Sequence, residues 1–80
     1  MRLLEYPINE SDARVLEKLK HKIDCENDRE LIDNAITLLH WAIEEAENGR
    51  KIASLDPKSK SYRVLEMKAL RKAAKTRRAA

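Results

Sequence analysis

Residues 1–12, MRLLEYPINESD, join a short segment with a two-residue apolar period directly to the start of a helix. Alternation of this kind is typical of a strand with one buried face. Asn9 is a favourable helix N-cap, and Asp12 stands three residues later in a variant of the capping box. We therefore predict a strand over residues 1–8 that stops where a helix begins, although no second strand lies near it in the sequence.

Two amphipathic helices follow this segment. Over residues 10–23, apolar side chains recur at steps of three and four while charged side chains hold the other face. The second helix, over residues 28–48, begins after Asn27, with Glu30 at the spacing of a capping box, and stops at Gly49. Its apolar positions cover more than one face, so we predict a central helix that is buried on two sides.

The segment after Gly49 changes character. The β-like runs IASL (52–55) and YRVLEM (62–67) flank DPKSKS, whose proline and serines predict a turn. We expect a hairpin there, followed by a basic helical tail in MKALRKAAKTRRAA. The predicted organisation is residues 1–49 as the core, 50–67 as a hairpin-like extension and 68–80 as the basic tail.

Charge divides the chain into an acidic body and a basic end. Residues 1–67 carry 11 Lys or Arg against 14 Asp or Glu, and residues 68–80 carry six cations and no acid. Such a run of cations is suited to a polyanionic partner, whereas the body is not. The cations of the tail are Lys68, Arg71, Lys72, Lys75, Arg77 and Arg78.

The composition excludes several kinds of chemistry. A single glycine rules out a glycine-rich phosphate loop, and Cys25 is the only cysteine, so there is neither an intramolecular disulfide nor a cysteine zinc cluster. No Ser, Thr or Cys stands in a recognisable nucleophile pattern. We predict that the protein is not an enzyme and binds no cofactor or metal. With no signal sequence and no apolar stretch of membrane-spanning length, a cytoplasmic location is expected.

An 80-residue chain with no disulfide buries little core alone. Two copies can pair their N-terminal strands antiparallel and pack their helices around one shared core, so that folding and dimerisation are one event. Burying Glu5 would be costly, which assigns the other face of the strand to this core. The predicted dimer core consists of Leu4, Tyr6, Ile8, Leu16, Leu19, Leu31, Ile36, Leu39 and Trp41.

Two stretches carry a resemblance to a known family: LEYPINESDARVLEKL (4–19), a capped strand-to-helix junction, and CENDRELIDNAITLLHWAIEEAENGRKI (25–52), a capped second helix. Together they resemble the ribbon-helix-helix family, the MetJ/Arc/CopG-like proteins, over about residues 1–67. The fold that the resemblance implies is mainly α. It is a homodimer with an intermolecular two-stranded antiparallel ribbon and two helices per chain, followed here by the β-like hairpin and the basic helical tail.

The resemblance implies DNA binding, with the ribbon in the major groove. The residues that would face the bases are Arg2, Leu3 and Glu5. The N-terminus of the second helix would clamp a phosphate through Asn27, Asp28 and Arg29. Glu5 departs from the basic or polar residues usual at such positions, although a carboxylate can accept a hydrogen bond from cytosine.

The sequence leaves more than one function open. The first is a dimeric DNA-binding protein, either a transcriptional regulator or an antitoxin-type repressor, whose tail adds affinity for phosphates. The second is a protein-interaction module on the same scaffold, which binds another protein through residues 52–78 with little or no DNA binding. The third is a plain helical hairpin dimer in which residues 1–8 form an unpaired arm.

Overall fold

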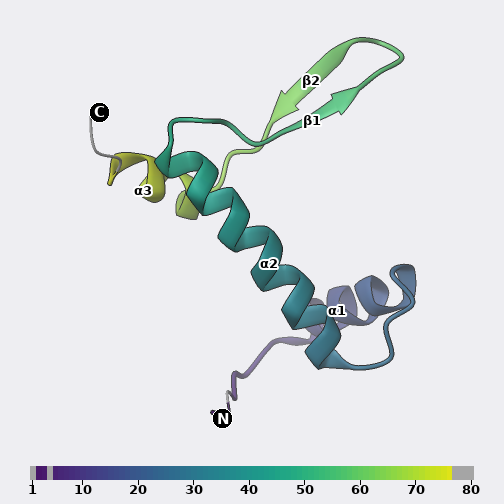
Figure 1. Cartoon of the computed structure of the whole chain (residues 1–80). Coiled ribbons are helices and arrows are strands. Elements are labelled where there is room, and N and C mark those ends of the chain that lie inside the picture. Colours follow the sequence, from purple (N-terminus) through teal and green to yellow (C-terminus); the bar gives the residue numbers. More distant parts are fainter. Residues whose placement is uncertain (1, 4, 77–80) are drawn as a thin grey trace. The chain divides into compact units, whose positions relative to one another are not determined.

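The computed structural model describes residues 2, 3 and 5–76. They form three helices and one two-stranded sheet, in the order α1 (Glu10–Lys22), α2 (Asp28–Glu47), β1 (Ala53–Asp56), β2 (Ser61–Val64) and α3 (Lys68–Lys75) (Figure 1). The chain divides into two compact units, one ending at Asn34 and the other starting at Ala35, and each is described by itself. The predicted mainly helical class with an antiparallel hairpin is confirmed, whereas the intermolecular ribbon and the dimer stay predictions.

Side-chain caps fix where the first two helices begin. The Asn9 Oδ1 accepts a hydrogen bond from the Asp12 backbone N–H at 2.8 Å, and the Asn27 Oδ1 accepts one from the Glu30 N–H at the same distance. Each bond satisfies one of the backbone donors that a helix start leaves without an intrahelical acceptor. Both predicted N-caps are confirmed, and each helix ends one residue before its predicted end.

The two helices also end alike. The Cys25 N–H donates to the Lys20 carbonyl and the Asp24 N–H to that of His21, at 2.9 and 3.2 Å. After α2, Arg50 and Gly49 make the equivalent bonds to Glu45 and Ala46, at 2.9 and 3.0 Å. This is the Schellman arrangement, in which the residue after the helix adopts a left-handed conformation. Gly49 has φ 79° and Asp24 has φ 53°, so the first helix ends through a residue with a Cβ.

The turn between α1 and α2 is held by charge as well as by backbone bonds. Lys20 Nζ lies 3.0 Å from a Glu17 oxygen and 2.9 Å from the Asp28 Oδ1. Hydrogen bonds to these two carboxylates raise the pKa of Lys20, the one to Asp28 most. Cys25 is buried here, and its Sγ donates to the Asn27 carbonyl at 3.3 Å. The turn is therefore held by backbone hydrogen bonds, two ion pairs and the Cys25 hydrogen bond.

The hairpin has one apolar and one polar face. The register pairs Ala53 with Val64 and Leu55 with Tyr62 on the first face, and Ser54 with Arg63 and Asp56 with Ser61 on the second. Residues 57–60 make the turn, where Asp56 Oδ1 accepts the Lys58 N–H at 3.0 Å. The predicted hairpin is confirmed, with a second strand that starts one residue earlier and is shorter than expected. All of its residues are exposed, including the apolar face.

A small core closes the C-terminal unit. Ala42 and Ala46 of α2 are buried together with Leu70 and Ala73 of α3, and Ile43 and Ile52 pack against them. Three of the four buried residues are alanines, so the two helices approach closely and bury little area. The expectation of a helix in the basic tail is confirmed for the residues up to Lys75, whereas Arg77 and Arg78 lie outside the described residues.

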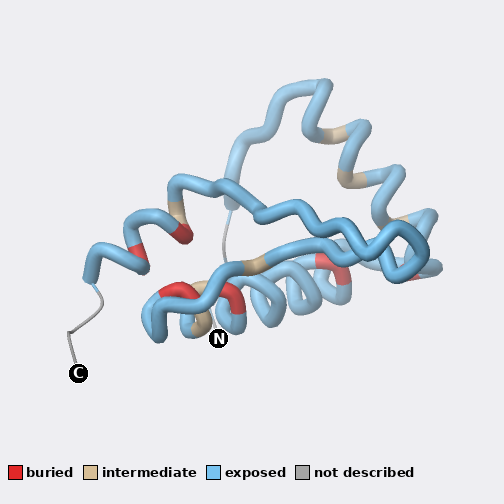
Figure 2. Tube along the Cα trace, turned by 90° about the horizontal axis from the view of Figure 1, so that it is seen from above, coloured by how far each residue is buried: buried red, intermediate tan, exposed pale blue. Residues whose placement is uncertain are grey.

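The middle of α2 differs sharply from its ends. Figure 2 shows buried positions near both ends of the helix, whereas every residue from Ile32 to Trp41 is exposed. The predicted burial on two sides is therefore not found within one chain. The reason is physical: the described chain supplies α3 to cover only the last turns of α2. None of the described helices is long and apolar enough to cross a membrane.

Candidate nucleic-acid interface

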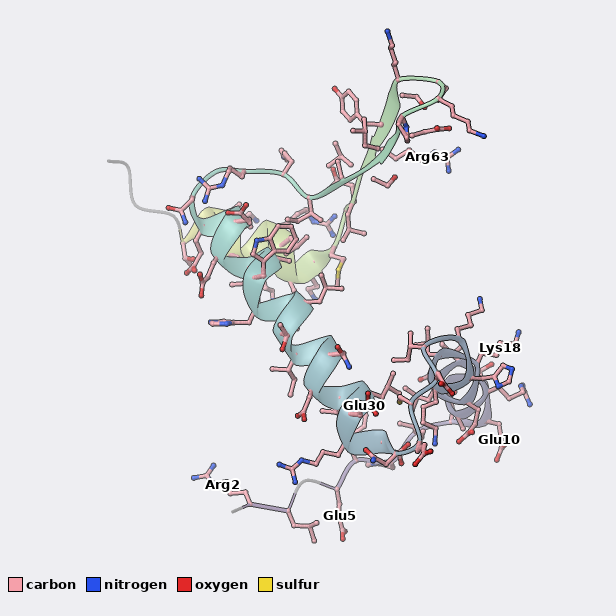
Figure 3. All side chains as sticks on the ribbon, turned by 45° about the vertical axis from the view of Figure 1, so that its right-hand side comes forward. Arg2, Glu5, Glu10, Lys18, Glu30 and Arg63 are labelled. Carbon is pink, nitrogen blue, oxygen red and sulfur yellow. The ribbon has the colours of Figure 1, made fainter. Side chains whose placement is uncertain are left out.

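The N-terminal segment has no strand partner within the described chain. Residues 2, 3 and 5–9 form neither strand nor helix, and Leu3 and Tyr6 are 86% and 79% exposed. Figure 3 shows the Arg2 and Glu5 side chains leaving this segment in different directions. Leu4, predicted to face the core, lies outside the described residues. The described part of this segment therefore forms no strand within the chain, and the intermolecular ribbon stays a prediction.

The predicted phosphate clamp at the start of α2 contains both a cation and acids. Asn27 serves as the cap of α2, and Asp28 is paired with Lys20. Arg29 is highly exposed, with its Nε 4.0 Å from the Asp33 Oδ2. Two acids, Asp28 and Glu30, stand in the first turn, where they favour the helix through its dipole but repel a phosphate. Of the three predicted residues, only Arg29 therefore offers a cation to an anion at this end.

Lys20 is a residue of this region that the sequence-based prediction missed. Its amine lies beside the first turn of α2, although Lys20 itself belongs to α1. Lys20 and Asp28 are eight residues apart, a spacing that does not by itself predict an ion pair. Only the left-handed turn at Asp24 brings the two side chains together. Lys20 neutralises part of the acidic character of the α2 start, which moderates the repulsion expected from Asp28.

The predicted dimer core falls into two groups. Two of the predicted residues, Ile36 and Leu39, share one face of α2 with Ile32 and Ile43, which were not predicted as dimer core. The four residues lie at steps of four, three and four, and this face is here called the α2 stripe. The first three are exposed and Ile43 is half-buried. Trp41, half exposed, is two residues from both Leu39 and Ile43, which places it on the opposite side of the helix. The structure brings Ile36 and Leu39 together but sets Trp41 apart from them.

Helix α1 and the start of α2 hold three further predicted core residues, and Ile8 precedes α1. Helix α1 contains no buried residue; Leu16 is half-buried, while Leu19 and Ile8 are exposed. Leu31 is buried at the start of α2. The described part of the N-terminal unit therefore exposes most of the apolar side chains that the sequence assigns to its core.

The cations of α3 lie on one side of that helix. Lys68, Arg71, Lys72 and Lys75 follow the helical spacing i, i+3, i+4, i+7, and the buried Leu70 and Ala73 occupy the opposite side. All four cations are exposed, and Arg71 Nη1 stands 3.7 Å from the Glu66 Oε2. We call these four residues the basic face of α3. Their spacing was present in the sequence, although only the net charge of the tail was used to predict them.

The hairpin adds cations that were not predicted as site residues. Lys58 and Lys60 lie in its turn, and Arg63 extends from β2 on the polar face (Figure 3). Lys60 has a left-handed backbone, φ 56°. No group of three or more metal-ligating side chains occurs among the described residues. The positive charge of the described chain is thus carried mainly by its C-terminal unit.

Comparisons with known proteins give no further constraint. No protein-family model, curated protein or solved structure matches the chain.

Proposed function

We propose that this protein is a homodimeric DNA-binding protein with a ribbon-helix-helix core, acting as a transcriptional regulator or an antitoxin-type repressor. The observation that carries the proposal is the α2 stripe, in which Ile32, Ile36 and Leu39 are exposed. Burying one large aliphatic side chain stabilises a protein by about 1.5–3 kcal/mol. A second copy that covers Ile32, Ile36 and Leu39 therefore supplies stability that the single chain lacks.

The order of elements supports the same proposal. An alternating segment, a capped helix, a short turn and a second capped helix follow each other without any insertion. In a dimer, two such segments pair into a ribbon that enters the major groove, as other two-stranded ribbons do. Arg2, Leu3 and Glu5 would then face the bases, and Arg29 would approach a phosphate at the start of α2.

The basic face of α3 supplies affinity for the phosphate backbone. Each Lys or Arg that neutralises a phosphate releases counterions, so binding weakens as the salt concentration rises. The acidic residues of the N-terminal unit oppose this attraction, and Glu5 brings a negative charge from each chain to the ribbon. We therefore expect weak binding to non-specific DNA, with most of the salt dependence arising from α3.

The test combines the size of the particle with its affinity for DNA. Light scattering should give the mass of a dimer, and fluorescence anisotropy with a labelled duplex of genomic sequence should show affinity that falls steeply between about 50 and 200 mM salt. The double variant Lys68→Gln, Lys72→Gln should weaken binding and flatten the salt dependence. The matched control Lys18→Gln, Lys22→Gln, on α1, should leave both unchanged.

A substitution in the ribbon tests the same proposal from the opposite direction. Glu5→Lys changes the charge at the ribbon by four units in a dimer, so it should tighten non-specific binding without altering the mass of the particle. A monomeric wild type, or an absence of binding to genomic fragments at low salt, would refute the proposed function.

A further inference from the structure

A groove lies within the C-terminal unit, outside every residue assigned to the ribbon or the α2 stripe. Its volume is about 340 Å³, and it is formed by the end of α2, the segments that flank the hairpin and one side of α3. The floor is apolar. It consists of Ile52, Leu65, Met67 and Leu70, of which Leu65 and Met67 are among the exposed large apolar side chains of the chain.

The rim of this groove is strongly cationic. Arg50, Lys51, Arg71 and Lys75 line it, against a single acid, Glu66. Arg71 is near Glu66, and Arg50 is tied to Glu45 by an Nε hydrogen bond of 2.7 Å, which raises the pKa of Arg50. Within the described part of the chain, neither Lys51 nor Lys75 has a carboxylate within 4.0 Å. Two cations of the rim therefore face solvent without a counter-charge.

We propose that this groove binds an acidic, amphipathic segment of a second protein. Apolar side chains of such a segment would cover Leu65 and Met67, while its carboxylates would pair with Lys51 and Lys75. Amphipathic helices dock into apolar grooves in this way, and complementary charge at the rim selects the partner. Methionine adapts its shape to different apolar surfaces, which suits Met67 to such a contact.

The chemistry of the floor separates this partner from a nucleic acid. DNA phosphates would pair with the same cations but would leave the apolar floor in contact with water. The volume is near the lower limit for small-molecule pockets, and it corresponds to a few side chains of a peptide. The groove also differs from the α2 stripe in its chemistry. A second copy of this chain would present mainly aliphatic side chains to the stripe, whereas the cationic rim of the groove suits acidic side chains.

The probe is a fluorescein-labelled helical peptide of about 15 residues, with Leu at every third or fourth position and Glu on its other side. Anisotropy should show saturable binding to the full chain. A second peptide with Lys in place of Glu should not bind. A short DNA duplex, added as a competitor, should displace the acidic peptide poorly, because DNA has no side chains to cover the floor.

Two pairs of variants locate the binding. Lys51→Glu with Lys75→Glu should weaken binding of the acidic peptide at least tenfold. The control, Lys58→Glu with Lys60→Glu, makes the same change of charge in the hairpin turn and should alter binding less than twofold. Met67 is the N-cap position of α3 and makes no side-chain capping bond. Met67→Ser therefore removes part of the floor while providing a cap, so it should weaken binding without loss of helix in circular dichroism.

The outcomes separate cleanly. Equal losses of affinity for the acidic peptide in the two lysine-pair variants would show that binding is general charge attraction, and would overturn the proposal. So would undiminished binding by Met67→Ser, efficient displacement by DNA, or no binding of the peptide to the wild type. Because none of these variants alters the ribbon or the α2 stripe, the mass of the particle reports on the proposed dimer independently.

Discussion

The last turns and the middle of helix α2 differ in how their apolar side chains are buried. Its last turns carry Ala42 and Ala46, which are buried against Leu70 and Ala73 of the same chain. Its middle carries Ile36 and Leu39, which the chain leaves exposed. Small residues thus occur where a neighbouring helix already lies close, and large ones occur where nothing in the described chain covers them.

This difference indicates where the stability of the protein must come from. Apolar burial contributes roughly 25 cal/mol per Å², and alanine side chains bury little area. The C-terminal core is therefore sufficient to hold α3 in place, but it is a small contribution to the folding of an 80-residue chain. Ile32, Ile36 and Leu39 of the α2 stripe remain exposed, so a second chain that covered them, as in the proposed dimer, would add to this stability.

The largest expected effect comes from a charge placed in the α2 stripe. Leu39→Asp should abolish the dimer and most of the helix content, because it puts a carboxylate into the predicted interface and removes a large apolar contact, at about 3 kcal/mol or more per chain. The matched control is Leu55→Asp in the hairpin. Leu39 and Leu55 are 41% and 70% exposed in one chain, so a protein that worked as a monomer would tolerate both substitutions.

Light scattering measures whether each variant is still a dimer, and circular dichroism measures whether it keeps its helices. Leu55→Asp should keep the mass of the dimer and the helix signal of the wild type. A Leu39→Asp protein that remained dimeric would contradict the assignment of the α2 stripe to the dimer interface, since the stripe would then face solvent in the assembled protein. Trp41→Asp is a useful addition: a small effect on the mass would assign Trp41, on the opposite side of α2, to the solvent.

The second effect concerns the core of the C-terminal unit. Among the described residues of this unit, Leu70 is the only large buried side chain, and Leu70→Ala should cost about 2 kcal/mol, at the lower end of the range for buried leucine because the site is shallow. The loss should be confined to α3 and the end of α2. Amide exchange should accelerate there while the mass of the particle stays unchanged. Lys72→Ala, on the exposed side of the same helix, should leave exchange unaltered.

Local sequence signals predicted the helices and the hairpin correctly because the causes are local. Asn9 and Asn27 cap helices through their own side chains, and Gly49 permits the left-handed residue at the end of α2. The hairpin followed from the apolar runs on either side of Asp56 and Pro57. The cap and helix-end bonds join residues three to five positions apart, and the hairpin pairs join residues no more than eleven positions apart, so one sequence was enough to place these elements.

The candidate site was harder to predict because it depends on contacts between distant residues. Nothing in the pattern near Lys20 indicated its ion pair with Asp28, which requires the turn at Asp24. Likewise, the groove bordered by Lys51 and Lys75 forms only when α3 packs against the end of α2. The apolar spacing in α2 revealed which side chains need cover, but not that the C-terminal turns find it within their own chain.

The third prediction uses the two asparagine caps, whose hydrogen bonds have equal length. Asn9→Ala and Asn27→Ala should each lower the free energy of unfolding by about 1 kcal/mol. If the start of α2 approaches a DNA phosphate, Asn27→Ala should weaken DNA binding more than Asn9→Ala does. Equal losses of affinity would show that the cap serves the fold alone. Urea unfolding and DNA anisotropy on the same samples separate the two roles.

The fourth prediction compares the two helix ends that share the Schellman arrangement. Asp24 adopts a left-handed backbone that costs a residue with a Cβ roughly 1 kcal/mol, whereas Gly49 adopts it freely. Asp24→Gly should therefore raise the free energy of unfolding by about 0.5–1 kcal/mol, and Gly49→Ala should lower it by about 1 kcal/mol. A destabilised Asp24→Gly protein would mean that the Asp24 side chain stabilises the turn beyond its backbone cost.

The smallest effect is a pH dependence confined to the hairpin. Hydrogen bonds from the Lys58 backbone, and then from Ser59, hold the pKa of Asp56 below its ordinary range. A carboxyl whose pKa is lower in the folded state stabilises that state above its unfolded pKa of about 3.9, and the contribution is lost as the pH falls through the folded pKa. Cross-strand NMR contacts between Leu55 and Tyr62 should therefore weaken in acid. Asp56 is the only carboxylate between residues 53 and 64, so Asp56→Asn should remove this dependence. Weakening that persists in the Asn variant would instead assign the acid sensitivity to a group outside the hairpin.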